Sequence, residues 1–175
     1  PDAAVDDSFI EFKRTMGSDK EFESVHLGRN FSSEELSSEV LKKLKSYVSD
    51  DDVRSAVITV PAKYTASQIN ATQKAAELAG FEYVELLQEP TAASIAYGIK
   101  SESSEGKWVV FDFGGGTFDV SILAIEAGIF TVKATAGDTH LGGEDFNNSM
   151  VDFLTAVFER RNPGKGLSTN DVALH

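Results

Sequence analysis

The sequence predicts an α/β fold, because strand and helix patterns alternate through its first hundred residues. The β-branched stretch 54–60 is followed by a helical pattern from Thr65, a second strand pattern at 83–87 and a short helix that opens at Pro90. Parallel strands need a crossover of this kind, and the crossover is right-handed in nearly all proteins. We therefore expect a parallel sheet in the first half of the chain.

Two of the expected helices begin with a recognisable capping pattern. Ser32 with Glu35, and Thr65 with Gln68, have the spacing of capping boxes. Apolar residues then recur at helical spacing, and the first of these helices is expected to cover 32–48.

The composition limits the class of partner. The chain has 175 residues, 41% of them hydrophobic, and a formal net charge of −12. Such acidity argues against nucleic acid or an anionic membrane as a partner. There is no cysteine, no apolar run approaches the length of a membrane span, and no signal sequence is visible. We expect a soluble, intracellular protein.

The most informative stretch is a glycine turn between two apolar runs, which predicts a β-hairpin. Glycines 115–116 at its tip suit a primed turn, in which both central residues have positive φ. Pairing around this centre sets Phe113 opposite Phe118, on an apolar face able to cover a core. On the other face Asp112 lies opposite Asp119.

The two facing aspartates predict a ligand. Like charges directly across a strand pair destabilise it, so a cation held near them best explains the arrangement. Glycine N–H groups can cradle an anion, and Thr117 adds a hydroxyl. Mg²⁺ prefers one or two carboxylates together with phosphate oxygens. The alternative is a tight hairpin with two solvated aspartates; a Walker A loop is excluded because no Gly-Lys-Ser/Thr follows.

Other positions are open to two interpretations. Glu89 follows a strand, where open α/β sheets bind ligands, but it also suits an ordinary helix start. Gly142 and Gly143 precede a helix that could host an anion, or they form an ordinary capped start. Lys13 is, on spacing alone, a surface lysine, and His140 has no partner at metal-ligand spacing.

The motif Asp-Phe-Gly-Gly-Gly-Thr-Phe-Asp-Val-Ser at 112–121 resembles the second phosphate loop of the actin, sugar-kinase and heat-shock-chaperone ATPases. The residues of this motif are similar to those of the seventy-kilodalton heat-shock chaperones, the DnaK-like family. Further literal matches follow in family order at 12–14, 56–62, 88–93, 95–98 and 136–146. The resemblance covers nearly the whole chain from about Phe9.

This resemblance implies an incomplete actin-like (ribonuclease H-like) ATPase fold with parts of two lobes. Residues 1–100 would form the remainder of lobe I, and 101–175 the start of lobe II with the phosphate hairpin. ATP or ADP and Mg²⁺ would be the ligands, with K⁺ as a further candidate ion. The family's own first phosphate hairpin has no counterpart before Phe9. We therefore expect this piece alone to bind ATP weakly or not at all, and to be inactive.

The resemblance also implies roles for individual residues. Lys13 matches the lysine that positions the γ-phosphate and the attacking water, and Glu89 the carboxylate held near Mg²⁺ through water. Asp112 and Asp119 match the pair near the metal ions, with Asp112 also orienting the water. The remaining matches are phosphate binders (Gly114, Gly115, Gly116, Thr117), nucleotide-cleft residues (Gly142, Gly143, Glu144) and a hinge proline, Pro61.

The function implied is part of the ATP-hydrolysing domain of a chaperone that drives binding and release of unfolded polypeptides. A J-domain co-chaperone and a nucleotide-exchange factor would be its partners, in the cytoplasm or in an organelle. One departure concerns coupling, because Ile69 stands where the family has an arginine used in interdomain signalling. The alternatives are a sugar or acetate kinase of the same superfamily, a filament-forming scaffold, and a binder that has lost hydrolysis.

Overall fold

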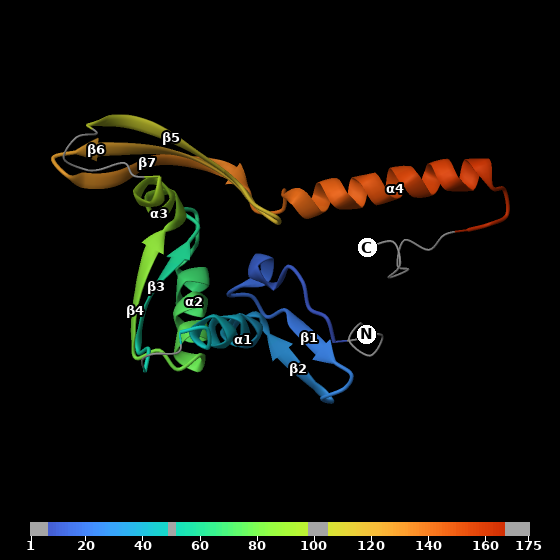
Figure 1. Cartoon of the computed structure of the whole chain (residues 1–175), viewed down its shortest axis with the longest axis horizontal. Helices are drawn as coiled ribbons and strands as arrows, with labels where there is room; N and C mark the ends of the chain where they lie inside the picture. The colour runs from blue at the N-terminus through green and yellow to red at the C-terminus, as the bar shows by residue number, and fades with distance from the viewer. Residues whose placement is uncertain (1–6, 49–51, 98–104, 167–175) are drawn as a thin grey trace.

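The computed structural model describes residues 7–48, 52–97 and 105–166, and its elements form three small sheets with helices between them (Figure 1). In chain order they are η2 (Phe12–Thr15), β1 (Glu21–Ser24), β2 (Arg29–Ser32), α1 (Ser33–Lys45), β3 (Ser55–Val60), α2 (Ala66–Leu78), β4 (Tyr83–Gln88), α3 (Glu89–Ala96), β5 (Gly106–Phe113), β6 (Phe118–Glu126), β7 (Ile129–Asp138) and α4 (Gly143–Arg161).

The predicted parallel crossover is confirmed. Strands β3 and β4 pair in parallel, from Ser55 opposite Tyr83 to Val60 opposite Gln88, and α2 connects them. Helix α3 starts directly after β4, so Glu89 is its first residue and Pro90 follows in the first turn. The crossover therefore delivers Glu89 to the carboxyl end of the two-stranded sheet.

Both capping boxes are confirmed. Ser32 accepts a hydrogen bond from the N–H of Glu35, whose carboxylate in turn accepts from the N–H of Ser32. Thr65 and Gln68 do the same at the start of α2. Helix α1 ends at Lys45 rather than at residue 48, because the N–H groups of Tyr47 and Val48 bond to carbonyls three residues back and tighten the last turn.

The core of the first half lies between η2 and the two helices. Met16 is buried against Ala71 and Ala75 of α2, with Leu41 of α1 packed beside them. Alanines on this side of α2 let α1 approach closely, which joins the first hairpin, β1–β2, to the crossover unit.

Strands β5, β6 and β7 form an antiparallel sheet, and the predicted hairpin register is confirmed. Phe113 pairs with Phe118, and Asp112 with Asp119. The predicted turn type is wrong, because glycines 115–116 are not among the described residues with positive φ. The loop instead spans 114–117 and is closed by the N–H of Gly114, which donates to the carbonyl of Thr117 at 2.9 Å. Partners outside the hairpin hold this loop, so it does not need the intrinsic twist of a primed turn.

The expectation that the apolar hairpin face covers a core does not hold in the described structure. Val109 and Phe111 on this face are 70% and 68% exposed. Helix α3 packs on the opposite face, where Leu123 and Ile125 are fully buried (Figure 1). The carboxylate face of the hairpin is therefore the one turned toward the rest of the molecule.

Strand β7 and helix α4 complete the description. Strand β7 continues to Asp138, and Gly137 pairs with Asp119 across the ladder. A Cβ at Gly137 would overlap the carbonyl oxygen of Phe118, so the absence of a side chain permits this close pairing. Helix α4 ends at Arg161 and projects away from the sheet (Figure 1).

Candidate functional site

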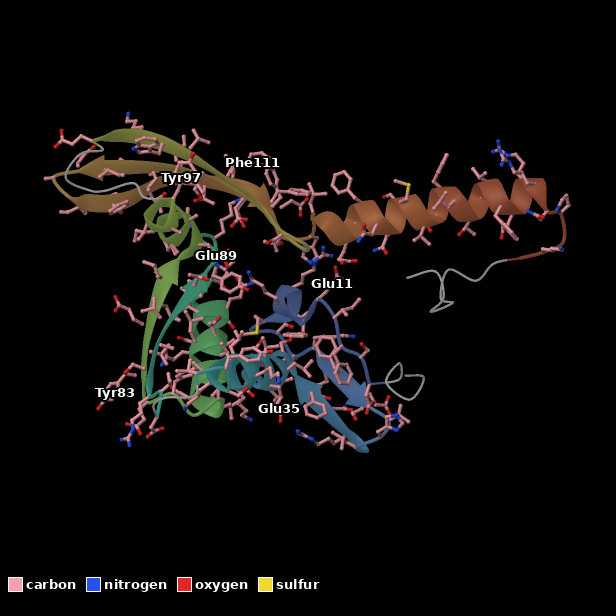
Figure 2. The ribbon with its side chains drawn as sticks, viewed as in Figure 1. Glu11, Glu35, Tyr83, Glu89, Tyr97 and Phe111 are labelled. Carbon is pink, nitrogen blue, oxygen red and sulfur yellow. The ribbon has the colours of Figure 1, made fainter. Side chains whose placement is uncertain are left out.

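A pocket of about 610 Å³ opens where η2, the start of α3, the hairpin loop and the start of α4 meet. Figure 2 labels Glu89, at the start of α3, and Glu11, immediately before η2, and both residues line the pocket. The lining residues are Ile10, Glu11, Lys13, Arg14, Glu89, Asp112, Gly114, Gly115, Gly116, Thr117, Glu144 and Asn148. The fold therefore brings together most of the site residues that the sequence predicted.

Lys13 and Glu89 form an ion pair in this pocket, with Nζ 2.9 Å from Oε1. The side chain of Glu89 is 17% exposed, whereas that of Lys13 is 53% exposed. Lys13 is therefore not a free surface lysine, as its spacing alone suggested, and its ammonium group remains open to a ligand on the pocket side.

The hairpin loop is held through its carbonyl groups. The N–H of Gly143 donates to the oxygen of Gly114 at 3.0 Å, and the N–H of Glu144 donates to that of Gly115 at 2.8 Å. Nε of Arg14 donates to the oxygen of Gly116 at 2.9 Å. Three consecutive carbonyls are thus anchored by the start of α4 and by one arginine.

Anchored carbonyls fix the directions of the loop's N–H groups. In a trans peptide the N–H points opposite to the carbonyl of the preceding residue, and no described peptide bond is cis. The N–H groups of Gly115, Gly116 and Thr117 therefore point away from the three anchors. Within the described residues these three N–H groups have no hydrogen-bond partner, and all three residues line the pocket. Successive free N–H groups of this kind form a nest for an anion.

Gly142 and Gly143, at the start of α4, lie against the backbone of this loop. Because the N–H groups of Gly143 and Glu144 bond to loop carbonyls, they are not free for an anion as the helix-start interpretation suggested. Gly142 is buried, and a Cβ there would overlap the backbone of Gly115 and Gly116. Of this trio, only Glu144 lines the pocket itself.

The predicted acidic pair lies next to the pocket. Asp112 lines it, and Asp112, Asp119 and Glu89 together line a smaller adjoining pocket. Burial raises the pKa of Asp119, and the neighbouring charge of Asp112 raises it further, while Lys63 and Lys13 act in the opposite direction. The two facing carboxylates thus repel each other, as expected from the register.

Mg²⁺ at this site would have to be held mainly through water and phosphate oxygens. Among the described residues no three His, Cys, Asp or Glu side chains are close enough together to enclose a metal ion. Mg²⁺ typically keeps several waters and takes one or two carboxylates together with substrate phosphates. Asp112 and Glu89 line the 610 Å³ pocket and can supply hard oxygen donors of this kind there. The crevice that they share with Asp119 is too narrow to admit a water molecule.

Tyr64 lies near the carboxylates of Glu89 and Asp119. Its hydroxyl donates to the carbonyl oxygen of Lys13 at 3.4 Å. Burial, followed by the negative charges of Glu89 and Asp119, raises the pKa of Tyr64 to about 12. The side chain is therefore a neutral hydrogen-bond donor over the whole physiological range.

Other predicted residues lie outside the pocket. Pro61 is buried at the end of β3, and its neighbour Ala62 lines the smaller pocket. His140 is exposed in the loop before α4, where its N–H donates to Asp138. Ile69 is exposed on α2.

Three residues that shape the pocket were not predicted from the sequence as site residues: Arg14, Glu11 and Asp145. Arg14 bonds to Asp145 across 131 residues of sequence, and no local spacing pattern marks such a contact. Glu11 has a left-handed backbone (φ 58°), which a sequence pattern does not reveal for a non-glycine residue.

Comparison with known proteins decides the family. The sequence model of the Hsp70 protein family matches residues 3–175. The chain belongs to the Hsp70 family. The "Heat shock 70 kDa protein" of Emericella nidulans is 51% identical over 150 residues, which are 83% of this chain and 23% of that relative. The Hsp70 chain described here therefore spans about a quarter of the relative's length.

Membership confirms the resemblance and the expected fold class. Hsp70 proteins have an actin-like ATPase fold, and three small sheets joined by helices are consistent with part of one. A sugar or acetate kinase is not favoured by this match. Among the described helices of this Hsp70 chain, none has the length and apolar character needed to cross a bilayer.

Proposed function

We propose that this segment forms part of the ATP-binding and ATP-hydrolysing domain of a molecular chaperone. In the full-length protein, nucleotide turnover would drive binding and release of unfolded polypeptides. A J-domain co-chaperone, a nucleotide-exchange factor and a cytoplasmic location are parts of the same proposal. Pro61, at the end of β3, would link nucleotide state to the rest of the protein.

One observation carries the proposal: the backbone N–H groups of Gly115, Gly116 and Thr117 have no partner within the described structure and belong to the pocket that also contains Lys13. Phosphoryl transfer is catalysed mainly by positioning and by neutralising charge. The loop would bind phosphate oxygens through its N–H groups and the hydroxyl of Thr117, and Lys13 would bring a positive charge to the terminal phosphate.

The carboxylates would act on the water and the metal. Asp112 and Asp119 would lie near Mg²⁺, and Glu89, which lines the pocket together with Asp112, would be held near the ion through water. When bound, Mg²⁺ would neutralise charge that develops on the phosphate oxygens; K⁺ is a further candidate ion. Asp112 would orient the attacking water, and the ion pair with Glu89 would fix the position of the Lys13 ammonium group.

The test compares Lys13→Ala with Lys42→Ala in the full-length protein under single-turnover conditions. Lys42 is a matched control, because it pairs with Glu39 at 2.7 Å, is 46% exposed and lies on α1 away from the pocket. Loss of a transition-state contact to a charged group commonly slows a reaction by about 100-fold or more. We expect that loss in Lys13→Ala only.

Equal hydrolysis rates in these two variants would refute the proposed role of Lys13. A full-length protein that neither binds nor hydrolyses ATP would refute the proposed function itself. The isolated chain 1–175 provides a third arm, since we expect it to bind Mg·ATP weakly or not at all; submicromolar binding would contradict this expectation.

A further inference from the structure

The guanidinium group of Arg14 contacts three separate segments of the chain. Nε donates to the carbonyl oxygen of Gly116 at 2.9 Å, and Nη2 donates to Oδ2 of Asp145 at 2.8 Å. Nη1 lies 3.2 Å from the carboxylate of Glu11. Every nitrogen of the group is therefore engaged, by the residues before η2, by the glycine loop and by the first turn of α4.

The fit around this group is close. The Arg14 side chain is 13% exposed, and a Cβ added to Gly116 would meet its Nε at 3.0 Å. Asp145 is itself fixed, because the oxygen that accepts from Arg14 also accepts from the N–H of Gly142 at 2.7 Å. The hydrogen bond from Arg14 holds the pKa of Asp145 below its usual value, so the carboxylate is ionised at neutral pH.

Arg14 differs in kind from the other two loop anchors. The oxygens of Gly114 and Gly115 are held by backbone N–H groups of α4, whereas that of Gly116 is held by a side chain. Its contact fixes the last peptide of the loop, and the N–H of that peptide belongs to Thr117. This N–H must therefore point away from Arg14 for as long as the contact persists.

We propose that Arg14 is a positioning residue that holds the loop 114–117 in the conformation able to bind phosphate. This inference rests on the proposed function but concerns a residue that contributes through the loop. Glu11 and Asp145 neutralise its charge, so the guanidinium acts on the loop's geometry more than on the charge of the ligand. A planar fork can serve Gly116 and Asp145 at once, whereas a lysine ammonium on one flexible stem is poorly matched to both.

The experiment uses the full-length protein with Arg14→Met, Arg14→Lys and the control Arg54→Met. Arg54 is also paired with a carboxylate, Asp52 at 2.7 Å, but lies at the start of β3 and outside the pocket. Two quantities are measured: the Kd for Mg·ADP, and amide hydrogen exchange in the nucleotide-free protein at Gly114, Gly143 and Glu144, whose N–H groups donate to the carbonyls of Thr117, Gly114 and Gly115.

We expect Arg14→Met to raise exchange at these three amides and to weaken Mg·ADP binding by about 10-fold, because binding must then order a loop residue that Arg14 no longer holds. Arg14→Lys should be intermediate, and Arg54→Met should stay within about twofold of the unsubstituted protein. Should Arg14→Met not fold, Arg14→Lys keeps the charge and makes the same comparison.

Unchanged exchange at Gly114, Gly143 and Glu144 in a folded Arg14 variant would overturn the proposal. So would raised exchange with unchanged Mg·ADP affinity, because the contact would then serve stability alone. If the unsubstituted protein bound no nucleotide, the proposed function would fail, whereas the exchange comparison would still decide whether Arg14 anchors the loop.

Discussion

The substitution Gly142→Ala gives the sharpest test of how the glycine loop is supported. Gly142 is buried behind the loop, and a Cβ there would overlap the backbone of Gly115 and Gly116. The backbone of Gly142 is extended (φ −166°), a conformation that alanine adopts without strain. Any effect of the substitution therefore comes from the collision with the loop.

The expected loss of stability in Gly142→Ala depends on which atoms must move to admit the new methyl group. Backbone atoms cannot rotate aside as the end of a long side chain does, so either the loop or the start of α4 has to shift. Overpacking a close-packed site costs about 1–3 kcal/mol in the free energy of unfolding. In a domain of this size each kcal/mol lowers the melting temperature by roughly 2–4 °C. Because the loop supplies the proposed phosphate contacts, the affinity for Mg·ADP should fall together with the stability.

The neighbouring Gly143→Ala variant is a closely matched control. A Cβ at Gly143 would meet the Cα of Gly115 at 3.7 Å, which is an ordinary van der Waals contact. Thermal unfolding and calorimetric titration of both variants in the full-length protein provide the comparison. If the two alanine variants agree within about 0.5 kcal/mol in stability and within twofold in affinity, the account of the loop's support is wrong.

Two further predictions concern Glu35, beside the hairpin β1–β2, and the exposed face of the hairpin β5–β6. The backbone N–H of Ser32 donates a hydrogen bond to the Glu35 carboxylate, and Arg29 adds a second; together they lower the pKa of Glu35 from 4.5. The contribution of this carboxylate to the free energy of unfolding is therefore fully present above pH 4.5 and is lost as the pH falls through the lowered pKa. Glu35→Gln should therefore flatten the acid limb of stability against pH in denaturant titrations, and an unchanged limb would contradict the reasoning. Phe111 is 68% exposed on the uncovered hairpin face, so the isolated chain should bind a hydrophobic dye. Phe111→Lys should reduce dye binding without lowering the melting temperature, whereas a large loss of stability would show that this face is packed.

Much of the fold could be predicted because its signals are local. The capping boxes at Ser32 and Thr65 and the parallel crossover all depend on neighbouring residues or on alternating patterns, and the structure contains each of them. The register that sets Asp112 opposite Asp119 could be predicted from the position of the glycines in the hairpin. The pairing of Asp112 with Asp119 is the part of the site that could be predicted from the residues alone, without the family resemblance.

The conformation of the loop could not be predicted in the same way. A glycine pair between two strands favours a primed turn when the hairpin is considered alone. Here the carbonyls are held by Gly143, Glu144 and Arg14, which are distant in sequence, and these contacts select a loop without positive φ at its centre. Tertiary contacts therefore override the local preference, and a pattern confined to the hairpin does not contain them.

The charges of the pocket explain why backbone groups matter so much in it. Its lining has two basic side chains, Lys13 and Arg14, and four acidic ones: Glu11, Glu89, Asp112 and Glu144. Both basic groups are already paired with carboxylates, Lys13 with Glu89 and Arg14 with Asp145 and Glu11. Such a lining, on a chain with a net charge of −12, repels a bare triphosphate. The free loop N–H groups offer partial positive charge, and a divalent cation bound with the phosphate would offset the carboxylates. The arrangement therefore suits an anion that arrives together with its own cation.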